Sequence, residues 1–242
     1  MRIFYAQLAP WWPLVSPVED YEEEAREIAR VIAAHAPRAR TLLELGSGGG
    51  HIAFYLKRAL ALTLTDLSPE MLAMSARLNP ECEHVPGDMR SLDLGRTFDV
   101  VFAHDAIDYM TTEDDLAAAI ETASRHLGPG GVAVFMPDHI AERYAPSTDH
   151  GGADGPDGRA LRFLEWTTEV APGATSGTTH YSFLVREADG SVRALHEAHA
   201  FGLFSQATWT RLFERAGFAV DAVEEVTNDD RAPRVLFIGR KR

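Results

Sequence analysis

The residues best suited to chemistry lie in one short segment, where an apolar strand runs into a glycine-rich turn. Residues 44–51 read ELGSGGGH, and the apolar run TLLEL, residues 41–45, leads into the glycines. Glycine allows a tight turn and lets a ligand approach the backbone closely. After the first strand of a doubly wound sheet, such a turn is typical of a nucleotide-binding site.

Two acids follow the turn at positions that fit recognition of a nucleoside. Asp66 ends the next apolar strand, about 20 residues after the turn, where a carboxylate can bind two ribose hydroxyls. Asp88 follows a short third strand, in Gly87-Asp88-Met89. The pattern therefore predicts a pocket for a ligand that contains a nucleoside.

Two features of the turn favour S-adenosylmethionine (SAM) over a dinucleotide. The dinucleotide motif Gly-x-Gly-x-x-Gly requires a glycine where this chain has His51. Glu44 precedes the turn, and its carboxylate would repel a pyrophosphate at short range. SAM has an ammonium and a sulfonium but no phosphate. The alternatives are a nicotinamide-dependent oxidoreductase, which these two residues disfavour, and a SAM-binding protein that transfers no methyl group.

Four segments together resemble the class I SAM-dependent methyltransferases. They are ELGSGGGH, LTLTDLSPEML, GDMRSLDLGRTFDVVFAHDAIDYM and HLGPGGVAVFMPD. The chain is most similar to actinomycete enzymes that act on small molecules, including the N-methyltransferases of deoxyamino-sugars. These share YxxEAxxIA near the start and HxxxLFxxAxW/Y before the last helix. The resemblance covers nearly the whole chain and is weakest at residues 139–200, where we expect acceptor specificity to lie.

The resemblance assigns the glycine-rich turn to the methionine end of SAM. Glu44 would support the ammonium, directly or through water, and the surrounding residues would be Gly46, Ser47, Gly48 and Gly50. SAM, with S-adenosylhomocysteine as its product, is accordingly the expected cofactor.

The resemblance also assigns residues to the nucleoside. Asp66 would bind the ribose hydroxyls, and Leu67 would lie against the adenine. Asp88 would bind the adenine amino group while Met89 donates a backbone N–H. His104 would contact the methionine part of SAM through its backbone.

Aromatic residues near the N-terminus are candidates for closing the pocket. Tyr5 and Tyr21 would fold over the cofactor by the resemblance, although simple packing explains them equally well. Trp11 and Trp12 are candidates for the substrate pocket, whereas we expect Trp209 to pack the last helix.

Polar residues follow two adjacent predicted strands at the ligand-binding edge of the sheet. They are Asp105, Asp138 and His139. An O-methyltransferase could hold Mg²⁺ with such groups, but no full set of oxygen ligands can be identified, and we expect no metal. Loop hydrogen bonds or substrate contacts are the favoured interpretation.

The expected reaction is an in-line attack of an acceptor O or N atom on the SAM methyl group, in which alignment is the main task of the protein. An oxygen acceptor also needs a base. Candidate bases are His139, which we favour, Asp105, Asp108 and His199, with Tyr109 orienting the substrate. The sequence does not decide between O and N.

The alternation of strands and helices predicts an α/β fold with a doubly wound, mostly parallel seven-stranded sheet and helices on both faces. The expected strands are residues 41–45, 60–65, 83–85, 98–103, 132–136, 218–225 and 234–239. The expected helices are residues 20–36, capped by Asp20, residues 50–58, a helix capped by Ser68, residues 112–127, ended by the glycines at 128–131, and residues 205–216, capped by Ser205.

A second pattern interrupts the alternation. Residues 160–171, 178–187 and 191–201 predict three antiparallel strands, and residues 150–158 predict a loop. We therefore divide the chain into a SAM-binding domain, residues 1–138 and 205–242, and an antiparallel β insertion, residues 139–204. The insertion would form a substrate lid or the interface of a homodimer. Within it, His196 and His199 point to opposite faces of a strand, and we expect His199 to point inward.

The composition and net charge limit the classes of partner that we expect for the chain. The 242 residues are 45% hydrophobic and 24% charged, with a net charge of −13 and one cysteine, Cys82. An acidic surface repels nucleic acid, and the proline-proline-aromatic motif of enzymes that methylate nucleobases is replaced by His104-Asp105-Ala106. No signal peptide or membrane-spanning run is found. The chain is expected to be cytoplasmic and to act on a small molecule, without nucleic acid or membrane partners.

Overall fold

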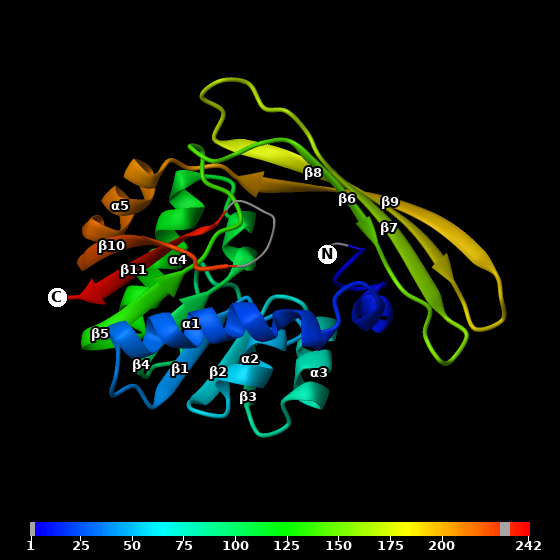
Figure 1. Cartoon of the computed structure of the whole chain (residues 1–242). Coiled ribbons are helices and arrows are strands. Elements are labelled where there is room, and N and C mark those ends of the chain that lie inside the picture. The colour runs from blue at the N-terminus through cyan, green and yellow to red at the C-terminus, as the bar shows by residue number, and fades with distance from the viewer. Residues whose placement is uncertain (1–2, 228–232) are drawn as a thin grey trace.

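The computed structural model describes residues 3–227 and 233–242, which form two β-sheets with helices around the first (Figure 1). The first sheet has seven strands in the order β10-β11-β5-β4-β1-β2-β3. Strand β11 runs antiparallel to both neighbours, and the remaining pairs are parallel. The strands are β1 (Thr41–Leu45), β2 (Ala61–Asp66), β3 (Glu83–Pro86), β4 (Phe98–Ala103), β5 (Leu127–Phe135), β10 (Phe218–Glu224) and β11 (Val235–Lys241). The predicted doubly wound sheet is confirmed.

Helices cover both faces of this sheet because its central strands are apolar on both sides. Leu42 packs toward the face under α1 and α2, and Leu43 packs toward the face under α4 and α5. The helices are α1 (Glu22–His35), α2 (His51–Leu56), α3 (Pro69–Leu78), α4 (Glu113–Arg125) and α5 (Gln206–Arg215). In the part of the chain that the structure describes, no helix is long and apolar enough to cross a membrane.

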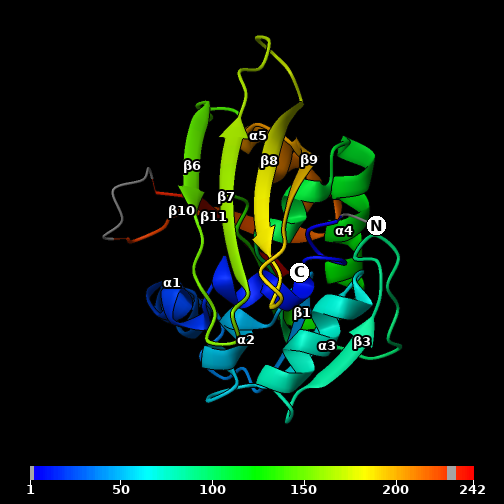
Figure 2. The ribbon, with the colours of Figure 1, turned by 90° about the vertical axis from the view of Figure 1, so that its right-hand side faces the viewer.

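The second sheet is antiparallel and lies over the carboxyl ends of the first (Figures 1 and 2). Its strands are β6 (Ser147–Gly151), β7 (Ala160–Thr167), β8 (Ser176–Arg186) and β9 (Val192–Gly202). The three predicted strands are confirmed, but the predicted loop at 150–158 begins too early. His150 and Gly151 belong to β6 and pair with Leu164 and Phe163. Main-chain pairing with the edge of β7 outweighs the turn preference of this glycine-rich stretch.

The N-terminal segment, residues 3–15, packs against the inner face of the second sheet. It contains the 3₁₀ helix η1 (Ala9–Leu14). Its buried side chains form one apolar cluster with those of β7 and β8, composed of Phe4, Leu8, Trp11, Leu161, Phe183 and Val185. Trp11 is buried in this cluster, so its prediction as a pocket residue is wrong. Trp209 is buried under the first sheet, as expected.

The predicted helix ends are correct where a side chain caps the helix. Ser68 accepts from the N–H of Met71, and Ser205 accepts from the N–H of Thr208. The prediction for Asp20 is wrong, because Asp20 lies inside a short 3₁₀ helix, η2 (Val18–Tyr21), and α1 begins without a side-chain cap. The glycines at 128–131 do not end a helix but belong to β5.

Gly50 packs the turn after β1 closely against α3. Gly50 has φ +77°, and a Cβ placed there would lie 2.3 Å from Ser75 Oγ and 2.4 Å from Asn79 Nδ2. Asn79 Nδ2 also donates to the Gly50 carbonyl oxygen at 2.9 Å. The turn is therefore held against α3 by contacts that only a glycine permits.

We expect Gly50→Ala to lower the free energy of unfolding by about 3 kcal/mol or more, from the left-handed backbone and the steric overlap together. Gly173→Ala is the matched control, because Gly173 has φ +78° and nothing within 4 Å of the added Cβ. Gly173→Ala should lower the free energy of unfolding by about 1 kcal/mol. Urea denaturation of both variants measures the difference, and equal losses would contradict the packing argument.

Candidate active site

One cavity of about 710 Å³ lies between the carboxyl ends of the first sheet and the inner face of the second. Every predicted catalytic residue lines it, and so does every predicted cofactor residue except Gly50. Gly50 does not line the cavity but packs behind the turn against α3, and its assignment to SAM stays a prediction. Trp12 lines the cavity, as expected.

Glu44 is the most unusual group in the cavity. Its side chain is buried at the end of β1, with 2% of the residue exposed, and Oε2 makes no hydrogen bond within the described residues. Desolvation raises the pKa of Glu44 to about 8, and the nearby carboxylates of Asp105 and Asp66 add to the effect, although His104 opposes it. A buried acid without a partner is costly to ionise, so it favours a cationic ligand.

The turn beside Glu44 brings backbone and carboxylate together. Gly46 and Gly48 have φ +75° and +52°, and the N–H of Gly48 donates to Asp66 Oδ2 at 2.9 Å. Asp66 Oδ1 accepts from the N–H of Ser68 at 2.7 Å. Burial raises the pKa of Asp66 despite these bonds. Next to this carboxylate Leu67 is 69% exposed, which leaves an apolar surface for a planar ring.

Asp88, on the same side of the cavity, is already engaged by a cation. Arg90 donates to its carboxylate through Nε and Nη2, and Arg90 Nη1 also contacts Asp115 Oδ1 at 2.9 Å. The Arg90 guanidinium accordingly lowers the pKa of Asp88. An adenine amino group would have to share oxygens that already accept from Arg90. Met89 lies beside Asp88 in the cavity lining. Its predicted backbone N–H contact with the adenine stays a prediction.

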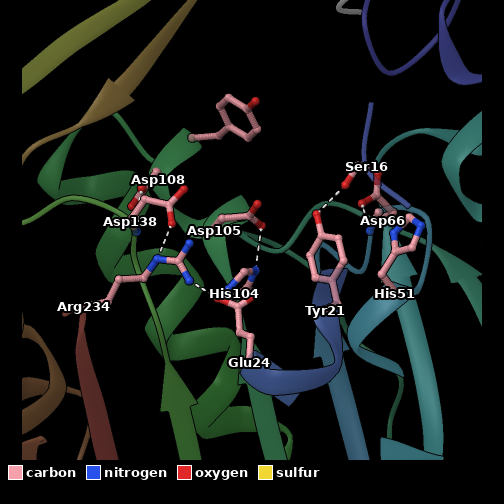
Figure 3. Close-up of polar contacts among 12 residues, drawn as sticks. Ser16, Tyr21, Glu24, His51, Asp66, His104, Asp105, Asp108, Asp138 and Arg234 are labelled. Atoms are coloured by element: carbon pink, nitrogen blue, oxygen red, sulfur yellow. Dashed lines mark hydrogen bonds and ion pairs between the residues drawn. The ribbon is translucent and has the colours of Figure 1, made fainter. Parts of the chain in front are cut away.

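A network of charged side chains, largely buried except at Asp105 and Asp138, forms the floor of the cavity (Figure 3). His104 contacts Glu24 Oε1 at 3.1 Å and Asp105 Oδ1 at 3.2 Å. Arg234 pairs with Glu24 and, at 2.7 Å, with Asp138 Oδ1. Desolvation alone lowers the pKa of His104, but the carboxylates of Asp105 and Asp138 outweigh it and raise the pKa to about 9. His104 is thus held as a cation by its side-chain contacts, beyond the backbone role that the resemblance implies.

The sequence analysis missed Glu24 and Arg234. Glu24 lies in the first turn of α1, where an acid is expected for the helix dipole alone. Arg234 directly precedes β11, far from every motif. The signal in the sequence for Arg234 was a charged residue directly before the apolar run at residues 235–238.

Asp108 does not have the environment of an ordinary base. Its Oδ2 accepts from the N–H of Asp138 at 2.9 Å. Burial raises the pKa of Asp108 well above its usual value, and the charges of Asp138 and Asp105 act in the same direction.

His139 packs on Phe201 with ring centroids 4.5 Å apart, and burial lowers its pKa. A base role for Asp108 or His139 stays a prediction.

Aromatic side chains close the cavity on the side of the second sheet. The Tyr5 hydroxyl lies 2.6 Å from that of Tyr109, which lies 3.0 Å from His199 Nδ1. Tyr21 stacks on His51 with centroids 5.0 Å apart. His199 is 3% exposed and points into the cavity, as predicted. Tyr5, expected near the cofactor, is therefore part of the same polar chain as the candidate catalytic residues.

No group of three or more His, Cys, Asp and Glu side chains suited to a metal is present among residues 3–227 and 233–242. Asp105 and Asp138 are instead paired with His104 and Arg234. The two carboxylates at the strand ends are thus each paired with a basic side chain.

Comparison with known proteins decides the class of the enzyme. Residues 42–131 match a family model described as a methyltransferase domain. A dTDP-3-amino-3,4,6-trideoxy-alpha-D-glucopyranose N,N-dimethyltransferase of Streptomyces venezuelae is 30% identical over 223 residues, 91% of this chain and 91% of that protein. This chain belongs to the SAM-dependent methyltransferases.

Two further relatives of this methyltransferase widen the comparison. A cypemycin N-terminal methyltransferase of a Streptomyces species is 32% identical over 204 residues, 82% of this chain and 78% of that protein. The SAM-bound structure of CalS10, an amino pentose methyltransferase from Micromonospora echinaspora, superposes with a TM-score of 0.75 at 28% identity, covering 92% of each chain. The methyltransferase uses SAM as its methyl donor, and the oxidoreductase alternative is set aside.

The residues of this methyltransferase fit SAM. The unpaired Glu44 oxygen suits the ammonium, and Asp66 suits the ribose hydroxyls. Leu67 offers an apolar surface to the adenine. Each of these groups lines the same cavity. The glycine turn between Glu44 and Asp66 has the backbone conformation that a close approach requires.

We expect SAM binding below pH 8 to release close to one proton, because the ammonium favours the ionised form of Glu44, whose pKa in the free protein is about 8. The release should fall to zero as the pH rises above that value. Calorimetry at pH 7 in two buffers of different ionisation enthalpy measures it.

Glu44→Gln removes the titrating group, so it should bind SAM at least tenfold more weakly and release no proton from this site. S-adenosylhomocysteine, which keeps the ammonium but lacks the sulfonium, is the control ligand and should behave in the same way. Equal proton release by the wild type and Glu44→Gln would contradict the assignment.

Proposed function

We propose that this methyltransferase transfers the methyl group of SAM to an amine nitrogen of a small molecule. The observation that carries the proposal is the composition of the cavity wall away from the glycine turn. That wall combines carboxylates with aromatic rings, namely Asp105, Asp138, Glu165, Tyr5, Tyr109, Tyr181, His139, His199 and Phe201.

Charge favours an amine at this wall. An amine reaches the enzyme largely as an ammonium ion, and carboxylates attract it. Asp105 and Asp138 retain partly exposed side chains, 54% and 37%, although each pairs with a cation of the floor. Tyrosine faces add a surface on which an ammonium ion is stabilised. A neutral alcohol has no positive charge for these groups to attract.

The relatives support the same acceptor atom. The Streptomyces venezuelae relative is named for N,N-dimethylation of an aminodeoxy sugar, and the cypemycin relative is named for methylation at an N-terminus. One acceptor is an amino sugar and the other is an N-terminus, and both present an amine. An amine of a secondary metabolite, such as an amino-sugar, is therefore the acceptor class we propose for this chain.

Alignment is the main contribution of the protein to the reaction we propose. SAM supplies a methyl group already activated by the positive sulfur. Glu44, Gly46, Ser47 and Gly48 hold its methionine end, while the nucleoside is bound by Asp66, Leu67, Asp88 and Met89. Tyr21 and His104 support this side from the floor. The acceptor wall places the nitrogen in line with the methyl carbon, which removes much of the entropic barrier.

We propose that the two sheets divide this work. Residues 1–138 and 205–242 bind the cofactor, and residues 139–204 bind the acceptor. The separate antiparallel sheet and the position of Tyr181 on β8 and of His199 and Phe201 on β9, all lining the cavity, support the division. The N-terminal segment packs with both parts, so it closes the cavity from the side.

Paired acceptors test the proposal. We expect the enzyme to methylate an aminodeoxy sugar and to leave the sugar with a hydroxyl at the same position unchanged, because only the amine is attracted as a cation. Mass spectrometry of the products after incubation with SAM measures one or two added methyl groups. Methylation of the hydroxyl compound alone would contradict the choice of nitrogen.

We further propose that the enzyme is a homodimer formed through the outer face of the second sheet. Leu164, Trp166, Leu184 and Val192 are 48–63% exposed on β7, β8 and β9, and an apolar face of this kind is typical of an interface. The cytoplasmic location stays a prediction.

Trp166→Lys should convert a dimer to a monomer, because a buried ammonium without a partner opposes association. Val226→Lys is the matched control, since Val226 is 67% exposed outside the sheet. Light scattering after size-exclusion chromatography measures the mass. A monomeric wild type, or a dimeric Trp166→Lys, would contradict the interface.

A further inference from the structure

A continuous polar chain leads from the cavity to the edge of the N-terminal segment. The Tyr5 and Tyr109 hydroxyl oxygens are 2.6 Å apart, and Tyr109 lies 3.0 Å from His199 Nδ1. On the far side of the ring, His199 Nε2 lies 3.1 Å from Glu197 Oε2. Tyr5, Tyr109 and His199 line the cavity, and Glu197 lies behind them.

The direction of each hydrogen bond follows from Glu197. Glu197 has a lowered pKa, because the bonds it accepts and the nearby His199 outweigh its partial desolvation, so it is a carboxylate and only accepts. A proton on His199 Nε2 faces this carboxylate at 3.1 Å, and this tautomer leaves Nδ1 to accept from the Tyr109 hydroxyl. Tyr109 must then accept from Tyr5. The lone pairs of the Tyr5 oxygen are left to accept from a group in the cavity.

The same carboxylate holds the N-terminal segment. Glu197 Oε1 accepts from the N–H of Ile3 at 2.8 Å, and Oε2 accepts from the N–H of Phe4 at 3.0 Å. On the other side, Ser68 Oγ donates to the Tyr5 carbonyl oxygen at 2.7 Å. Ser68 is also the residue whose N–H binds Asp66. Residues 3–5 are thus held between β9 and the cofactor side of the cavity.

We infer that Tyr5, Tyr109 and His199 form a path that removes one proton from the bound ammonium before methyl transfer, and that Glu197 is a positioning residue which orients His199 and holds Tyr5 in the path. This inference rests on the proposed function, since it takes the acceptor to be an amine. It also selects His199 over His139 as the final proton acceptor.

The step balances in atoms and charge. The bound ammonium first gives one proton to the Tyr5 oxygen as Tyr5 gives its own to Tyr109 and Tyr109 gives its own to His199 Nδ1, which frees the lone pair of the nitrogen. The neutral nitrogen then forms a bond to the methyl carbon, and the carbon–sulfur bond breaks with its electron pair remaining on sulfur. The product leaves as the methylated ammonium. Both tyrosines end neutral. The imidazolium that results lies beside the Glu197 carboxylate, which stabilises it until the proton passes to water.

The test compares kcat and KM across pH for Glu197→Gln, His199→Gln and the double variant. Each single variant should lower kcat about tenfold at pH 7, keep the KM for SAM within twofold, and regain activity at high pH, where the ammonium loses its proton to solvent. The double variant should be no slower than the slower single variant, because both act on one path. A purely structural loss would neither recover with pH nor be non-additive.

Two further variants keep the test decisive. Tyr109→Phe removes only the hydroxyl that joins Tyr5 to His199, so it should show the same pH rescue even if a Glu197 variant folds poorly. Glu187→Gln is the matched control, because Glu187 pairs with Arg193 at 3.2 Å outside the cavity lining, and it should keep the wild-type profile. Melting temperatures establish that each variant is folded.

The two proposals fail in different ways. The variants are measured with whichever acceptor the wild type methylates in the paired test, so an alcohol as acceptor would overturn the amine proposal while the path is still examined. Multiplicative losses in the double variant, or losses that high pH does not restore, would overturn the proton path alone.

Discussion

The site depends on a carboxylate that is buried without a full set of partners. Glu44 lies at the end of a central strand, under the glycine turn, and one of its oxygens makes no hydrogen bond among the described residues. Such a group is costly in the free protein and becomes favourable only when a cation arrives. The chain reduces the cost by binding a proton, which is why the pKa is raised to about 8. A ligand ammonium replaces that proton, and the same charge excludes a pyrophosphate.

The floor of the cavity solves a related problem by pairing. Glu24, His104, Asp138 and Arg234 come from four separate parts of the chain and neutralise one another (Figure 3). Buried ion pairs of this kind contribute little net stability, because desolvation offsets the attraction. Their value lies in orientation, since removing one partner would leave a buried charge. The floor thus fixes the strand ends on which Asp105 and Asp138 face the cavity.

The N-terminal segment joins the two halves of the molecule. Its apolar side chains pack with the second sheet, whereas its backbone is bound by Glu197 on one side and Ser68 on the other. The first sheet and the second sheet are therefore joined by one segment beside the cavity. Residues 3–5 therefore contact the glycine-turn side of the cavity, the second sheet and the tyrosine–histidine chain.

Local patterns in the sequence were enough for the seven-stranded sheet, the capped helices and the order of Glu44, Asp66 and Asp88, because periodicity, caps and glycine turns depend on near neighbours. The pairing of β6, the burial of Trp11 and the structural role of Gly50 depend on residues distant in the chain, so no local signal marked them. The same holds for Arg234 and Glu197. Burial and ion pairing are properties of the packed fold, and only tertiary structure decided which charges meet.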